Sequence, residues 1–161
     1  MRAFLKLLFV AALLAAAWSH RSWAQVTQTV TFEVDAINQI ALTGAPSLLI
    51  NAATPGSPPT SVQSTGVTWA VTTNQTGSTI SASIASAMPA GLTLSVDLAA
   101  PAGATANGLK PVSTIPVALV TGVTKVAAGG LTVTYQLDAT AAAGVVSSST
   151  KVVTFTITGG V

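Results

Sequence analysis

Apolar and polar residues alternate with a period of two along most of this chain, a pattern typical of half-buried β-strands. The longest alternating run spans residues 26–36, with Val30, Phe32 and Val34 on its apolar side. Alternation recurs at residues 67–72, 92–98, 131–137 and 153–158, and shorter candidate strands are residues 37–42, 48–51, 78–84 and 113–123, the last broken at Pro116. Residues 139–143 are rich in alanine but too few to form a stable helix.

Turn-forming residues separate the candidate strands. They occupy residues 54–59, 74–77, 88–91, 101–103 and 128–130. The sequence Asn74-Gln75-Thr76-Gly77 predicts a hairpin turn, in which Gly77 supplies a positive φ. About eight to ten short strands joined by such turns predict an all-β fold, a single antiparallel β-sandwich. In a sandwich each sheet buries one face and leaves the other in water, as the alternation requires.

The predicted core of the sandwich consists of small aliphatic residues around four aromatic ones, Trp69, Phe32, Tyr135 and Phe155. Three of them are its predicted anchors: Trp69, Tyr135 and Phe155. Each lies at an apolar position of an alternating segment. Trp69 and Tyr135 have an alternative reading, because exposed aromatic rings can form a platform on which sugars stack. Their positions in strong strand patterns favour the core.

Residues 1–24 have the features of a secretory signal peptide. Arg2 and Lys6 give a positive start, and residues 7–18 carry no charge. That run is shorter than the roughly 20 residues of a membrane-spanning helix, and small residues before Gln25 predict cleavage there. We therefore expect export, no membrane span after cleavage, and a product that is secreted or held at the cell surface by its partners.

Cleavage changes the composition on which any functional argument depends. Removal of 24 of the 161 residues leaves a domain of 137, residues 25–161, with three lysines against four acids and a net charge of −1. Nucleic-acid binding needs clustered Lys and Arg, so it is not expected. The domain also contains no His, Arg or Cys. Ser-His-Asp and Cys-His catalysis and zinc sites are thereby excluded, and we expect neither enzymatic activity nor a cofactor or metal.

Two pairings remain as weaker alternatives. Ser148 or Ser149 could pair with the nearby Lys151, although a solvated loop is the simpler reading. Glu33 and Asp35 lie on one strand face, about 7 Å apart, and could make a weak calcium contact. Calcium prefers six to eight oxygen ligands, so an outward polar face is the simpler reading there.

The closing residues resemble the last strands of known bacterial surface proteins. Residues 137–140, 143–144 and 152–158 are similar to the ends of WxL-type domains, spore coat U-like proteins and fimbrial subunits. Residues 29–40, 69–71 and 88–92 also resemble exported bacterial β-sandwich proteins of no assigned role. The chain departs from fimbrial and coat patterns in having no cysteine pair, and from WxL domains in lacking paired Trp-x-Leu motifs. The resemblance implies an extracellular structural or adhesive role and transfers no functional residue.

The scarcity of charge suggests how such a protein could act. Natural edge strands are protected from pairing with other chains by Lys, Pro or bulges, yet the 137 residues of this domain include only three lysines. We therefore predict a non-enzymatic surface protein that forms a homo-oligomer or fibre by β-strand pairing. Its first strand would be donated to a neighbour through Val30, Phe32 and Val34, or would pair within its own domain. The alternative is a monomeric module that binds glycan or a surface protein through residues 53–60 and 99–109.

Overall fold

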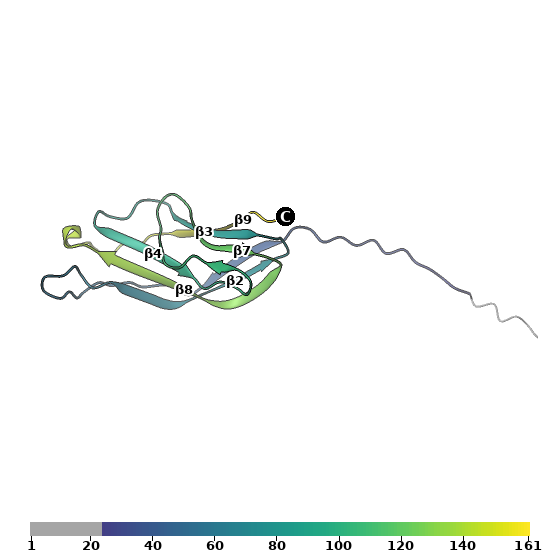
Figure 1. Cartoon of the computed structure of the whole chain (residues 1–161), viewed down its shortest axis with the longest axis horizontal. Coiled ribbons are helices and arrows are strands. Elements are labelled where there is room, and N and C mark those ends of the chain that lie inside the picture. Colours follow the sequence, from purple (N-terminus) through teal and green to yellow (C-terminus); the bar gives the residue numbers. More distant parts are fainter. Residues whose placement is uncertain (1–23) are drawn as a thin grey trace, which may run out of the picture. The chain divides into compact units, whose positions relative to one another are not determined.

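The computed structural model describes residues 24–161, so the predicted signal peptide lies outside the described residues apart from Ala24. The chain divides into two units, Met1–Val34 and Asp35–Val161. All nine described strands belong to the second unit (Figure 1). They are β1 (Asn38–Thr43), β2 (Val62–Thr73), β3 (Ser78–Ile84), β4 (Leu92–Leu98), β5 (Thr105–Ala106), β6 (Lys110–Pro111), β7 (Val117–Val123), β8 (Val126–Ala139) and β9 (Val153–Thr158). A single 3₁₀ turn, η1 (Ala141–Ala143), is described besides the strands.

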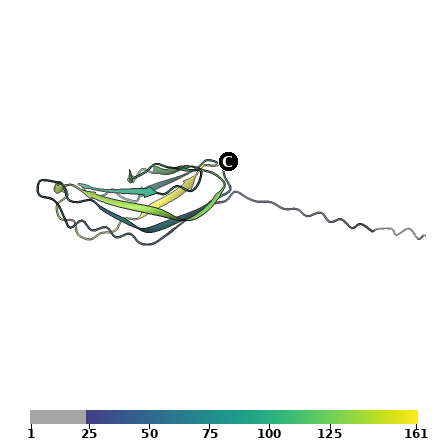
Figure 2. The same ribbon diagram turned by 60° about the horizontal axis from the view of Figure 1, so that its bottom comes forward.

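The strands form two antiparallel sheets, and the predicted all-β fold is confirmed. One sheet has the order β1-β2-β8-β4-β6 and the other the order β5-β7-β3-β9. Figure 2 shows the two sheets as facing layers of the second unit. The edge strands are therefore β1 and β6 in the first sheet and β5 and β9 in the second.

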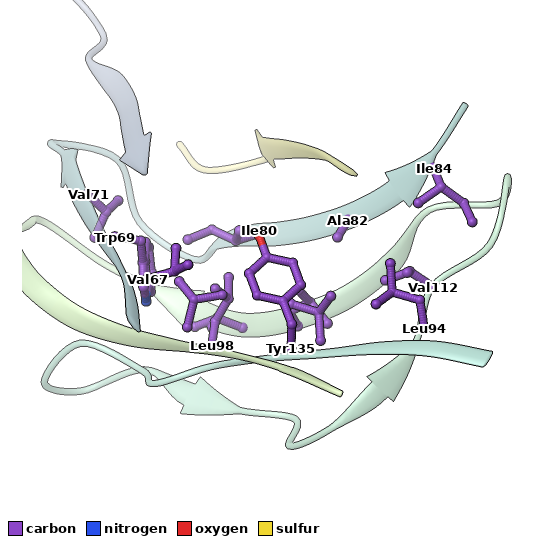
Figure 3. Packing of buried hydrophobic residues seen from close by; sticks show 14 of the residues in the cluster. Val67, Trp69, Val71, Ile80, Ala82, Ile84, Leu94, Leu98, Val112 and Tyr135 are labelled. Atoms are coloured by element: carbon purple, nitrogen blue, oxygen red, sulfur yellow. The ribbon is translucent and has the colours of Figure 1, made fainter. Parts of the chain in front are cut away.

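The core fills the space between the two layers (Figure 3). Trp69 is 1% exposed and Tyr135 is 5% exposed, and both project between the sheets from β2 and β8. The indole nitrogen Nε1 of Trp69 donates a hydrogen bond of 3.1 Å to the carbonyl oxygen of Ala99. Phe155 lies on the edge strand β9, where it is half-buried and packs against the cluster. Aliphatic side chains, mostly Val, Leu and Ile, supply the rest of the core. The predicted core position of Phe32 is wrong: its side chain is 90% exposed, because its segment belongs to neither sheet.

Several strand bounds coincide with the alternation, and others do not. Residues 78–84, 92–98 and 153–158 form β3, β4 and β9. The candidate at 113–123 yields a strand only from Val117, directly after Pro116, because proline cannot donate to the ladder. The predicted strands at residues 26–36 and 48–51 are wrong: neither is assigned as a strand. Alternation shows that a segment can pair, but a strand also needs a neighbouring backbone to pair with.

The prediction of a hairpin at residues 74–77 is also wrong. These residues connect β2 and β3, which belong to different sheets, so the turn is a corner between the two layers. Gly77 has the expected positive φ of 77°, and its N–H donates to Thr124 Oγ1 at the neighbouring corner. Turn residues show where the chain reverses, but not which sheet its next strand joins.

Residues 128–130 form a bulge within β8 where the sequence predicts a turn. Leu131 is paired with Trp69, and Ala128 is paired with Val71. Two glycines of β8 therefore lie opposite the single residue Ala70. Gly130 has a φ of 68°, which suits a glycine at the extra position of a bulge.

We expect Trp69→Ala to lower the free energy of unfolding by about 3–5 kcal/mol, because it empties a large volume of the core. Trp69→Phe should cost less, since it keeps most of the ring volume and loses the hydrogen bond to Ala99. Urea unfolding followed by far-ultraviolet circular dichroism measures both. Equal unfolding midpoints for wild type and Trp69→Ala would contradict the core position of Trp69.

Tyr135 makes stability depend on pH at the alkaline end. Burial raises the pKa of Tyr135 above its ordinary value of 10.0, so the folded state holds the phenolic proton more firmly than the unfolded chain does. This contribution is complete below about pH 10 and is lost as the pH rises through the folded-state pKa. Urea midpoints at roughly pH 8 and pH 11 should fall less in Tyr135→Phe than in wild type. An identical decline in both proteins would show that other groups cause it.

Candidate assembly surface

The segment before β1 carries the apolar residues that the sequence singles out for strand pairing. Within the described part of the chain, residues 24–37 are assigned to no strand. Val30 is 72% exposed, Phe32 is 90% exposed and Val34 is 77% exposed. Three large apolar side chains at alternate positions thus face solvent, and they form the apolar face of a segment with the periodicity of a strand.

The side chain of Asn74 holds the chain where this segment joins the folded unit. Its Oδ1 accepts a hydrogen bond of 2.8 Å from the N–H of Ile37, and its Nδ2 donates one of 2.7 Å to the carbonyl oxygen of Asp35. The backbone N–H of Asn74 adds a bond of 3.2 Å to the carbonyl oxygen of Ile37. One donor and one acceptor on the amide substitute for a neighbouring strand. We call these three bonds the Asn74 clamp.

The clamp continues the backbone hydrogen bonding of β1 towards the N-terminus, as far as residue Asp35. The ladder between β1 and β2 ends at the pair Asn38 and Thr73, where Thr73 Oγ1 also donates to Asn38 Oδ1 over 2.7 Å. Residues 35–37 then continue towards the N-terminus with their backbone bound to Asn74. Sequence patterns place Asn74 in a turn but do not predict the clamp, because its partners lie more than thirty residues away.

A shallow hollow lies beside the clamp. Its lining residues are Ile37, Thr72, Thr73, Asn74, Lys125, Val126 and Ala127. Lys125 is the only charged residue among them, and its backbone has a φ of 41°, unusual for a residue with a side chain. Its N–H donates to the carbonyl oxygen of Gln75 across the corner. The lining of this hollow combines one ammonium group with neutral groups, so it lacks the pair of proton donor and proton acceptor that acid–base catalysis needs.

Strand β9 presents the more apolar of the two longer sheet edges. Its side chains alternate between half-buried Val153, Phe155 and Ile157 and exposed threonines. Of the backbone hydrogen bonds in the described chain, those of β9 belong to its ladder with β3, which leaves its other edge unpaired. No Lys or Pro lies between residues 153 and 158 to protect that edge.

The other residues considered for chemistry lie in structural roles. Trp69 and Tyr135 are buried, so they cannot form a sugar-stacking platform. Lys151 Nζ donates to Ser86 Oγ and to the carbonyl oxygen of Ala87, both at 2.8 Å, and these bonds connect it to the β3–β4 loop. Ser86 is not predicted from the sequence as a partner of Lys151, because 65 residues separate the two. The described residues hold no group of three His, Cys, Asp or Glu side chains placed to bind a metal.

A polar network joins β2, β8 and Ser61, the residue before β2, and no sequence pattern predicts it. Ser61 Oγ donates to Asp138 Oδ1, and Gln136 Nε2 donates to the two carboxylate oxygens of Asp138 over 2.9 and 3.0 Å. Gln63 Nε2 donates to Gln136 Oε1 over 2.6 Å. The one carboxylate of this network, that of Asp138, accepts hydrogen bonds from neutral donors. The bond between Gln63 and Gln136 connects β2 with β8.

We expect Asn74→Ala to speed hydrogen exchange at the Ile37 amide by about fivefold, since one hydrogen bond contributes about 1 kcal/mol. Asn74→Asp is the matched variant, because it keeps an oxygen that can accept from Ile37 and removes the donor to Asp35. It should preserve most of the protection. Exchange rates from nuclear magnetic resonance test both, and an unchanged Ile37 rate in Asn74→Ala would refute the clamp.

Comparison with known proteins provides no relative from which a function can be transferred to this chain. The described residues include no helix long and apolar enough to cross a membrane. No protein-family model matches the chain, and searches of curated proteins and of solved structures find no match either.

Proposed function

We propose that this protein is an exported, non-enzymatic structural or adhesive subunit that assembles with its own copies by β-strand pairing. The observation that carries the proposal is the segment 26–36, which alternates like a strand, exposes its apolar side chains and pairs with no strand. Residues 1–24, with the features of a signal peptide, support export and an extracellular or cell-surface location.

The energetics favour pairing once an acceptor edge is present. Burial of a Val or Phe side chain contributes about 1.5–3 kcal/mol, and three such side chains alternate here. An added strand also gains a ladder of main-chain hydrogen bonds, which is the basis of β-augmentation. The donor and the edge of β9 therefore supply complementary halves of a sheet.

The Asn74 clamp favours pairing between copies over pairing within one chain. A segment that entered the sheet of its own domain beside β9 would have to reverse direction close to residues 35–37. The clamp holds those residues extended through three hydrogen bonds. Such a reversal would break them, whereas a neighbouring copy can receive the segment with the clamp intact.

We expect the exported protein, produced from the full 161-residue chain, to form oligomers whose size increases with concentration. Phe32→Lys should abolish them, because pairing would bury an unpaired ammonium at a cost of several kcal/mol. At concentrations low enough to keep the wild type monomeric, the two proteins should have the same free energy of unfolding, since Phe32 is exposed in the single copy. Size-exclusion chromatography with light scattering, together with urea unfolding, measures the two effects.

Thr31→Lys is the matched control, because it places the same charge on the polar side of the segment. It should assemble like the wild type. A wild-type protein that stays monomeric at every concentration would overturn the proposal and favour a monomeric module that binds glycan or a surface protein.

A further inference from the structure

Building on the proposed assembly, we propose that the acceptor is the free edge of β9 in a second copy. The donated segment would lie antiparallel to β9, with Phe32 opposite Phe155. This pairing adds a fifth strand to the β5-β7-β3-β9 sheet at its open end.

The side chains of β9 favour it over β1, the other long edge. The inward side of β9 consists of Val153, Phe155 and Ile157, all apolar and all half-buried. Half-burial at an edge leaves apolar surface that one more strand would cover. The corresponding row of β1 begins with Asn38, whose amide is already bonded to Thr73.

The spacing of apolar residues selects one register. In an antiparallel pair the numbers of opposite residues have a constant sum, and side chains opposite each other share a face. With Phe32 opposite Phe155, Val30 lies opposite Ile157 and Val34 lies opposite Val153. A shift by two residues in either direction leaves one of these three β9 side chains opposite Gln28 or Ala36, in place of Val or Phe. The polar side chains then fall together on the outer face, with Thr31 opposite Thr156.

Length and charge agree with this register. The six residues of β9 span roughly 20 Å, and the segment before the clamp is long enough to cover them. Asp35 falls opposite Val152, next to Lys151. The two acceptors of the Lys151 ammonium in the described chain are the neutral oxygens of Ser86 and Ala87. A carboxylate from a second copy would supply the opposite charge.

The antiparallel direction also predicts the form of the assembly. Val153, where the donor would end, pairs with Ile84 at the end of β3. The donor's own folded unit would therefore meet the host at this end. The host's own segment leaves from the opposite end, where Asn38 pairs with Thr73 and Thr158 pairs with Thr79. Each copy thus keeps a free donor at one end and a free acceptor along β9, and the contact is head-to-tail and open. Parallel pairing would bring two exit points together and close a dimer.

Thiol cross-linking tests the register, because the wild-type chain contains no cysteine. Exported Thr31→Cys protein is mixed with exported Thr156→Cys protein and treated with a short bifunctional maleimide. The matched control replaces the acceptor with Thr43→Cys, an exposed threonine on the β1 edge. Mass spectrometry identifies the linked peptides, and light scattering on each sample records assembly before the reagent is added.

We expect linkage of position 31 to position 156 and at least a tenfold lower yield to position 43, with an open series of oligomer sizes. Assembly with preferred linkage to position 43, with linkage to neither position, or with closed dimers alone would overturn the β9 register and leave the proposed function standing. Samples that remain monomeric before cross-linking would refute the proposed assembly, and this inference with it.

Discussion

The antiparallel pairing of β2 with β8 is the interaction on which the rest of the fold depends. These are the two longest strands, and their ladder runs from the pair Val62–Leu137 to the pair Thr73–Val126. Trp69 and Tyr135 enter the core from this pair. β1 attaches to the outer edge of β2, and β4 attaches to the outer edge of β8. The positions of β1 and β4, the two strands that flank this pair, therefore follow from the central ladder.

Two irregularities shape that ladder. The register shifts between Ser64 and Val67, and again between Trp69 and Val71. Each bulge increases the local twist of a sheet. A twisted sheet can close over a core of small aliphatic side chains, and such a core is what this chain contains. The shifts lie on both sides of Trp69, the largest buried side chain.

The small number of charged residues in the domain affects its outward strand faces and its sheet edges. Few charged side chains have to be kept in solvent, so most outward positions can carry Ser or Thr, which suit a wet strand face. β9 contains no lysine to protect its edge, and no proline either. The clamp binds the backbone of Asp35 and Ile37, directly after the exposed apolar residues Val30, Phe32 and Val34. The proposed assembly by strand pairing needs an unpaired edge and an unpaired segment with the alternation of a strand, and a single copy has both.

Sequence periodicity by itself determined the fold class, because a period of two places apolar side chains on one face of a pleated strand and nowhere else. It also located β4 and β9 to the residue. Proline marked the start of β7 for an equally local reason, the missing N–H of Pro116. Such features depend on neighbouring residues, which is why they can be read along the chain.

Only the tertiary structure decided which strands have partners. Residues 26–36 alternate as clearly as 153–158, yet only the second segment is paired as a strand, with β3. The corner at residues 74–77 and the bulge at 128–130 both involve glycine, and their different roles depend on the strand opposite. The Asn74 clamp joins positions more than thirty residues apart. Pairing, register and clamping are contacts between distant segments, and alternation along one segment contains no record of its neighbour.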